Sequence, residues 1–198
     1  MFVTFEGVDW SGKSTQAKLL AAWLREQGRT VLTTREPGGT PVAEGVRELV
    51  LHGDEMSPWA EASLYAASRA ENVATVIRPA LERGEDVVCD RYLDSSVAYQ
   101  GAGRGLGEER VRDLSLLVTG GLLPDRTFLV LLDPAEALAR AGSHHDRIER
   151  TGSEFMERVD RAYRALAEAE PERIIAVDGS KKPDEIAEEI REHARSLL

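Results

Sequence analysis

The chain has 198 residues, 42% of them hydrophobic, which suits one domain with a full hydrophobic core. Its formal net charge of −10 argues against a protein that binds nucleic acid by neutralising phosphates, and its single cysteine, Cys89, excludes an internal disulfide. No basic and apolar leader pattern opens the sequence, and the longest wholly apolar run, residues 128–132, is too short to cross a bilayer. We therefore expect a cytoplasmic protein that contacts neither nucleic acid nor membrane.

Short apolar segments alternate with longer helical patterns along the chain. The predicted strands cover residues 2–6, 30–34, 86–90, 126–132 and 173–177. The predicted helices cover residues 13–27, 41–51, 58–83, 108–119, 154–169 and 183–197. Continuous apolar runs are typical of strands buried on both faces, and regular alternation with helices predicts an α/β fold. The pattern thus predicts a five-stranded parallel sheet flanked by helices, with ligands at the carboxyl ends of the strands.

One polar segment, RAGSHHDRIERT at residues 140–151, interrupts this alternation. It contains Gly142 and lies between two predicted helices. Such a segment is either a lid over the site or a plain surface connection. We expect a short lid there, within a single domain that spans residues 1–198.

The sequence GVDWSGKS after the first strand matches the phosphate-binding pattern G-x-x-x-x-G-K-[ST], with a helix predicted to follow it. Glycines at both ends let backbone N–H groups surround phosphate oxygens, and the positive end of the helix dipole points at the same anion. Lys13 is expected to reach the β- and γ-phosphates. The loop residues predicted to bind the nucleotide are Gly7, Val8, Asp9, Trp10, Ser11, Gly12, Lys13, Ser14 and Thr15.

A second acidic position supports a nucleotide site. The apolar strand at residues 86–90 ends in Asp90, and an acid there holds Mg²⁺ in many proteins with this loop. We expect Ser14 and Asp90 to arrange a magnesium ion, the alternative being that Asp90 only caps the next turn. Because Asn72 is the only asparagine, an Asn-Lys-x-Asp guanine reader is absent. A compact kinase of the P-loop type, acting on small molecules, fits better than a regulatory GTPase.

Four segments resemble the thymidylate kinase family, in the order in which that family carries them. They are TREPGGT at residues 34–40, LYAASR at 64–69, VCDRYLDSSVAYQG at 88–101 and DRIE at 146–149. The resemblance runs from about residue 2 to the end of the chain, and the segment at 88–101 is its most specific part. It implies transfer of the γ-phosphoryl group of ATP to dTMP, giving dTDP. It also implies a homodimer that pairs through apolar helix faces, for which the helix at 58–83 is a candidate.

The resemblance assigns the thymine and sugar contacts to two segments, residues 64–69 and 88–101. Tyr65 is expected to stack on thymine, with Arg69 one helical turn further on the same face; packing in the core and a surface ion pair are the alternatives for these two residues. Tyr99 is expected to face the sugar and to exclude a 2′-hydroxyl. Ser96 and Gln100 are candidates for polar contact with the base, whereas Ser95 is expected to be structural.

The phosphate end of dTMP is assigned to charged residues. Arg91 is expected to hold the acceptor phosphate, with Arg35 and Glu36 beside the same phosphate and metal; a surface position is the alternative for Arg35. Asp9 is expected near the 3′-hydroxyl, where a carboxylate orients arginine guanidinium groups rather than acting as a strong base. The alternative for Asp9 is a solvated loop acid.

The arginine that stabilises charge on the transferring phosphoryl group is the last assignment. Some members of the family carry it in the phosphate loop after the acid, where this chain has Trp10, so the lid must supply it. We expect Arg147 to make this contact, Arg150 to be the reserve, and Arg140 to stack on adenine, which the turn at residues 178–181 would also line. The predicted catalytic residues are therefore Lys13, Arg91, Arg147 and Asp9. The rival hypotheses are another nucleoside or nucleoside monophosphate kinase, and a nucleotide-dependent regulatory module.

Overall fold

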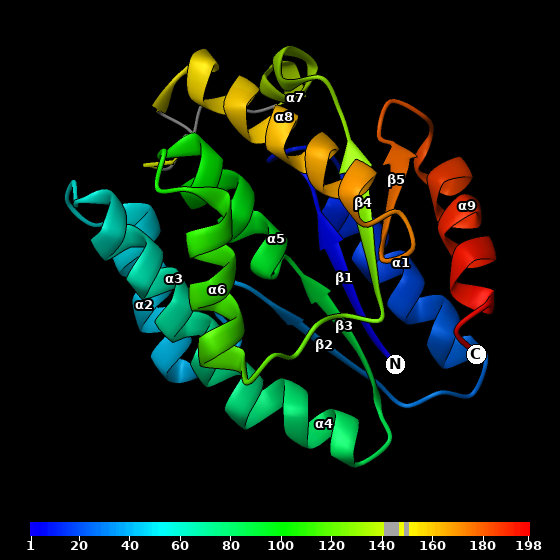
Figure 1. Cartoon of the computed structure of the whole chain (residues 1–198). Coiled ribbons are helices and arrows are strands. Elements are labelled where there is room, and N and C mark those ends of the chain that lie inside the picture. The colour runs from blue at the N-terminus through cyan, green and yellow to red at the C-terminus, as the bar shows by residue number, and fades with distance from the viewer. Residues whose placement is uncertain (141–146, 149–150) are drawn as a thin grey trace.

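Five parallel strands form one sheet in the order β2-β3-β1-β4-β5 (Figure 1). In this computed structural model, residues 1–140, 147–148 and 151–198 are described. The strands are β1 (Phe2–Glu6), β2 (Val31–Arg35), β3 (Asp86–Asp90), β4 (Arg126–Leu131) and β5 (Ile174–Asp178). The predicted fold class is confirmed, and each predicted strand is found within one residue of its expected bounds.

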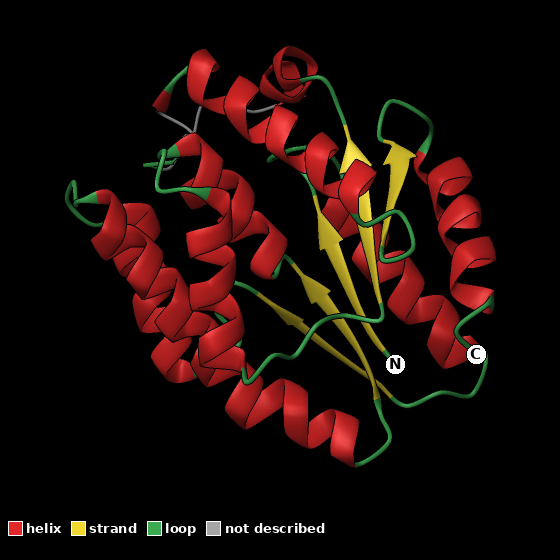
Figure 2. Ribbon diagram, in the orientation of Figure 1, coloured by secondary structure: helices red, strands yellow, loops and turns green. Residues whose placement is uncertain are grey.

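Helices cover both faces of this sheet (Figure 2). The α-helices are α1 (Lys13–Glu26), α2 (Pro41–His52), α3 (Pro58–Asn72), α4 (Arg78–Glu82), α5 (Leu93–Ser96), α6 (Glu108–Thr119), α7 (Pro134–Arg140), α8 (Ser153–Ala169) and α9 (Pro183–Arg195). Two π-helical segments, η1 (Val73–Ile77) and η2 (Val97–Gly103), connect some of them. No helix among the described residues is both long and apolar enough to cross a membrane.

The sheet separates two hydrophobic clusters because side chains alternate between its faces. Val3 and Phe5 of β1 pack with α1 and α9 on one face. Phe2 packs in the larger cluster on the other face, which includes residues of α8 and η2. Both faces are therefore dry, and this explains why the strands read as continuous apolar runs.

The single helix predicted at residues 58–83 is instead divided into α3, η1 and α4. Pro79 lies at the start of α4, directly after the π-helical segment. Proline cannot donate a hydrogen bond to the carbonyl four residues earlier and its ring crowds that carbonyl, so regular α-helical pairing cannot continue through it. The helical segments α5 and η2, which carry much of the specific 88–101 motif, were not predicted as helix.

The order of the strands places the phosphate loop next to Asp90. β1, which leads into the phosphate loop, pairs directly with β3, and Phe5 is in register with Asp90. β2 pairs with the other side of β3, with Arg35 opposite Asp90. Because all strands are parallel, Glu6, Arg35 and Asp90 share the carboxyl edge of the sheet, where ligands bind in such folds.

Candidate active site

At two positions of the phosphate loop, the backbone adopts a conformation that only glycine takes without strain. Gly7 has φ 138°, and a Cβ there would lie 2.5 Å from the carbonyl oxygen of Val130. Gly12 has φ 97° and precedes α1 directly. Both glycines therefore let the loop turn tightly over the end of the sheet and into the helix. Trp10 also has a left-handed φ, 65°, and its side chain is 47% exposed beside α7 and α8.

Lys13 lies inside this loop and is almost fully buried. Its Nζ donates to the carbonyl oxygen of Val8 at 3.3 Å and to Oδ1 of Asp9 at 3.3 Å. Burial lowers the pKa of Lys13, as does the nearby charge of Arg91, while Asp9 acts in the opposite direction. The ammonium group is thus held at the start of α1, where it can reach a bound phosphate.

Asp9 and Arg91 form the centre of the site. The guanidinium of Arg91 donates to Oδ1 of Asp9 at 2.6 Å and to the carbonyl oxygen of Gly7 at 3.0 Å. Burial raises the pKa of Asp9, but the positive charges of Arg91 and Lys13 outweigh this and hold the pKa well below its usual value. Asp9 is therefore an anion that joins two cations, which argues against a role as a base. Arg91 itself has φ 70°, an uncommon conformation for a side chain of this size.

Ser14 and Asp90 line one hollow that runs along α1. Oδ1 of Asp90 is buried and has no hydrogen-bond partner within the part of the chain that the structure describes. A buried carboxylate oxygen without a partner is costly unless a ligand satisfies it. Carboxylate and hydroxyl oxygens are ligands that Mg²⁺ accepts, so these two side chains fit the predicted metal.

A pocket opens beside Asp9 and Arg91. Eight of the nine residues predicted to bind dTMP line this pocket, although they come from four separate segments of the chain. They are Asp9, Glu36, Tyr65, Arg69, Arg91, Ser96, Tyr99 and Gln100.

Arg69 is a buried bridge between elements, not the surface ion pair that was its alternative interpretation. Its guanidinium donates to Oε2 of Glu36 at 2.8 Å, and also to Ser96 Oγ, to Ser115 Oγ and to the carbonyl oxygen of Tyr92. Burial raises the pKa of Glu36, and the charge of Arg69 opposes the rise. The pair therefore fixes the wall of the pocket between β2, α3 and α5.

Arg35 is the one residue predicted to bind dTMP that does not line this pocket. Its side chain is half-exposed, is paired with Glu44 of α2 at 2.9 Å, and lines the hollow of Ser14 and Asp90. The strand end places it outside the acceptor pocket but in the hollow of the two predicted metal ligands, so its position agrees with the metal side of the prediction and not with the acceptor pocket. Arg47 of α2 lines the pocket instead and donates to the carbonyl oxygen of Pro37 at 3.0 Å. No local motif marks Arg47, because its position depends on how α2 packs.

Arg147 also has a different partner from the predicted one. Its side chain is buried against Glu61 of α3 at 2.8 Å, and its Nε donates to the carbonyl oxygen of Val50 at 3.0 Å. Glu61 in turn accepts from Gln100 at 2.9 Å, and Ile148 lines the pocket. Arg147 thus lies on the acceptor side, and a contact with the transferring phosphoryl group would require this buried ion pair to open. Arg150, the reserve candidate, lies outside the described residues.

The opposite side of the phosphate loop carries the residues predicted for adenine. The guanidinium of Arg140 donates to the carbonyl oxygen of Gly179 at 3.3 Å and to Glu136 at 2.8 Å. Gly179 itself lies against the phosphate loop, since a Cβ there would be 3.2 Å from the carbonyl oxygen of Ser11. The end of α7 and the turn after β5 therefore meet next to the donor loop.

This arrangement defines a kinase of the P-loop class, with a donor site at the loop and an acceptor pocket that share Asp9. The model of the thymidylate kinase family matches residues 5–190. A thymidylate kinase of Leifsonia xyli subsp. xyli is 59% identical over 96% of this chain and 92% of its own length. One of Clavibacter sepedonicus is 54% identical over 100% and 96% of the two chains.

A crystal structure of thymidylate kinase from Ehrlichia chaffeensis superimposes with a TM-score of 0.83 at 32% identity, covering 98% of both chains. Sequence and structure therefore agree over nearly the full length. The chain belongs to the thymidylate kinase family.

Proposed function

We propose that this chain phosphorylates dTMP to dTDP, with ATP as the donor, by direct in-line transfer. One observation carries the proposal: Asp9 belongs to the donor loop and also lines the acceptor pocket, where Arg91 binds it at 2.6 Å. Two phosphates bound in these sites would meet at that pair. Family membership supplies the identity of the acceptor, and the polar pocket beside the loop supports it.

On the donor side, Lys13 and the loop amides of residues 7–15 hold the phosphates of ATP, and Arg140 lies on the side of the adenine. Mg²⁺ held by Ser14 and Asp90 would neutralise charge on the donor phosphates. The chain's own residues provide positioning and electrostatic stabilisation, because the acceptor is already an anion and needs no strong base.

On the acceptor side, the aromatic ring of Tyr65 and the polar groups of Ser96 and Gln100 hold the base. Tyr99 is almost fully buried and its hydroxyl donates to Asp9 at 3.2 Å, which favours a position against the sugar. Arg91 binds the acceptor phosphate. These assignments follow from which side chains line one pocket and from the family resemblance.

A substrate panel tests the acceptor. The purified chain, with ATP and Mg²⁺, should release ADP fastest with dTMP among the common nucleoside monophosphates and nucleosides. A preference for another monophosphate would favour the rival kinase hypothesis. ATP binding without ADP release for any acceptor would favour a regulatory module.

We also propose a homodimer that forms through α2, α3 and α6, of which α2 and α6 each pack on α3 (Figure 1). Large apolar side chains are exposed on these helices, namely Val42 (62%), Leu49 (53%), Trp59 (39%) and Leu117 (78%). Sedimentation that shows only monomer at micromolar concentration would contradict this. A cytoplasmic location and independence from nucleic acid remain predictions from the sequence.

A further inference from the structure

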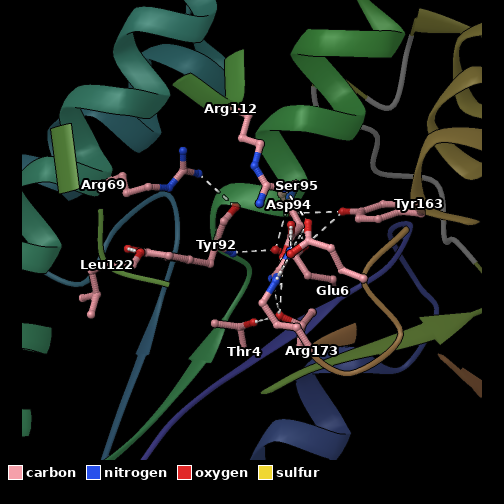
Figure 3. Close-up of polar contacts among 12 residues, drawn as sticks. Thr4, Glu6, Arg69, Tyr92, Asp94, Ser95, Arg112, Leu122, Tyr163 and Arg173 are labelled. Carbon is pink, nitrogen blue, oxygen red and sulfur yellow. Dashed lines mark hydrogen bonds and ion pairs between the residues drawn. The ribbon is translucent and has the colours of Figure 1, made fainter. Parts of the chain in front are cut away.

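A fully buried carboxylate, Glu6, lies at the carboxyl end of β1, directly before the phosphate loop (Figure 3). Its Oε1 accepts hydrogen bonds from the backbone N–H groups of Tyr92 at 2.8 Å and Ser95 at 3.1 Å. Its Oε2 accepts from the hydroxyls of Ser95 at 2.5 Å and Tyr163 at 3.0 Å. A single side chain of β1 therefore anchors the turn after β3 and one residue of α8.

Both of these hydroxyls also contact Arg91. One guanidinium nitrogen of Arg91 donates to Ser95 Oγ at 2.9 Å and to the hydroxyl oxygen of Tyr163 at 3.3 Å. A hydroxyl has one proton to donate. The two hydroxyl oxygens also lie 3.0 Å apart, so each proton can go to Glu6 or to the other hydroxyl. A charged carboxylate is the stronger acceptor. When each hydroxyl gives its proton to Glu6, its lone pairs are left to accept from the arginine, so the carboxylate sets how both hydroxyls point.

The hydrogen bonds of Glu6 to backbone N–H groups also act on Arg91. Arg91 has φ 70°, and the next residue, Tyr92, donates its N–H to Glu6. Such a conformation persists only where surrounding contacts hold it. Glu6 therefore fixes Arg91 in two ways, through the turn that carries it and through the hydroxyls that its guanidinium contacts.

We propose that Glu6 is a positioning residue for Arg91, and that its carboxylate sets the place of the guanidinium which binds the acceptor phosphate. This rests on the role proposed above for Arg91. Glu6 does not reach the pocket, so its effect passes through Ser95, Tyr163 and the backbone.

The electrostatic surroundings of Glu6 agree with this role. Burial raises the pKa of Glu6 to about 7, Asp94 adds to the rise, and Arg91 opposes it. Asp94 is itself paired with Arg173 at 2.7 Å. The other titratable groups that face Glu6 are Tyr163 and Cys89, from α8 and β3. Protonation of Glu6 would turn it from an acceptor into a donor on one oxygen, so Arg91 should lose its orientation as the pH falls through about 7.

The variant Glu6→Gln tests this at constant shape. The amide oxygen can still accept from the two backbone N–H groups, while the amide nitrogen must donate to the hydroxyls and so reverses their orientation. We expect kcat/KM for dTMP to fall about ten- to a hundredfold, since a displacement of about 1 Å at a reacting group costs about a hundredfold. KM for dTMP should rise while KM for ATP stays within about twofold. A fall in kcat alone, with both KM values unchanged, would show only a lost active fraction and would overturn the proposal.

A double-mutant cycle separates this proposal from the role of Arg91. Arg91→Lys should be impaired on its own, and adding Glu6→Gln to it should cost less than about threefold. Additive losses in an impaired Arg91→Lys background would overturn the proposal for Glu6 and leave Arg91 in place. Arg91→Lys with wild-type kinetics would instead refute the role proposed for Arg91.

Two further variants guard against a folding effect. Ser95→Ala removes one of the two hydroxyls that connect Glu6 to Arg91 and leaves the carboxylate of Glu6 in place. We expect a several-fold lower kcat/KM for dTMP. Asp86→Asn changes another buried carboxylate, paired with Arg29 at the far end of β3, and should leave KM for dTMP unchanged.

In pH profiles, a fall in kcat/KM below about pH 7 should be steeper in the wild type than in Glu6→Gln, because titration of dTMP itself is common to both. Identical profiles, or an unaffected Ser95→Ala, would count against the proposal.

Discussion

The phosphate-binding loop of the donor side is one stretch, residues 7–15, whereas the acceptor side joins side chains from distant parts of the chain, such as Tyr99 and Asp9, which are 90 residues apart. The donor loop uses backbone geometry and one buried lysine. The acceptor pocket uses buried ion pairs, such as that of Arg69 with Glu36, to hold its walls. A substitution in the loop should therefore affect mainly catalysis, while one in the pocket wall should affect folding as well.

The variant Arg69→Met gives the strongest test of this difference between the donor loop and the pocket wall. It leaves Glu36 buried without its ion-pair partner, which costs about 3–5 kcal/mol of unfolding free energy in comparable cases. Since the pKa of Glu36 is already raised by burial, the loss should be larger at pH 8 than at pH 5, where Glu36 can take up a proton. Urea unfolding at the two pH values measures it.

The matched control for that variant is Arg161→Met, which removes an exposed arginine that lies 3.9 Å from Glu157. An exposed pair of this kind contributes at most about 1 kcal/mol. Equal losses in the two variants would contradict the view that the pocket wall depends on its buried pair.

On the donor side, Lys13→Ala should leave unfolding free energy nearly unchanged and lower kcat about 10² to 10³-fold, the usual cost of removing one preorganised donor. Asp9 retains Arg91 as a partner, so the loop does not keep an unpaired anion. Steady-state kinetics with saturating dTMP and ATP measure the fall. A stability loss as large as that of Arg69→Met would erase the difference between the two sides.

The position of Arg147 sharpens the comparison, because the sequence suggests the donor side and the structure gives the acceptor side. From the ion pair with Glu61, which also accepts from Gln100, we expect Arg147→Ala to raise KM for dTMP about tenfold and to lower kcat less than about threefold. A large fall in kcat at an unchanged KM would restore the contact with the transferring phosphoryl group. Arg150→Ala, measured in parallel, tests the reserve candidate.

The same contrast explains what the sequence can predict. The phosphate loop was predicted residue by residue because its chemistry depends on spacing within one segment. Asp90 was predicted as a metal ligand because it ends an apolar strand. Arg35 was predicted for the pocket and Arg47 was missed, since which of them faces the pocket depends on the end of β2 and the packing of α2. The sequence marks Glu6 only as the last residue of a predicted strand, because its partners Ser95 and Tyr163 lie 89 and 157 residues away.

Tyr99→Phe is expected to have the smallest effect. It separates the role of the Tyr99 hydroxyl, which contacts the donor loop, from the role of the ring, which packs in the acceptor pocket. The hydroxyl donates to Asp9 at 3.2 Å, whereas the ring packs edge-on against Phe155 and Tyr163, with centroids 6.0 Å and 6.3 Å away. Removing the hydroxyl should cost about 1 kcal/mol, or about fivefold in kcat/KM for dTMP. The ring stays, so discrimination against the ribonucleotide analogue of dTMP should not change. If the variant accepts that analogue, the hydroxyl and its bond to Asp9 exclude the 2′-hydroxyl, and the sugar contact belongs to the donor loop as much as to the pocket.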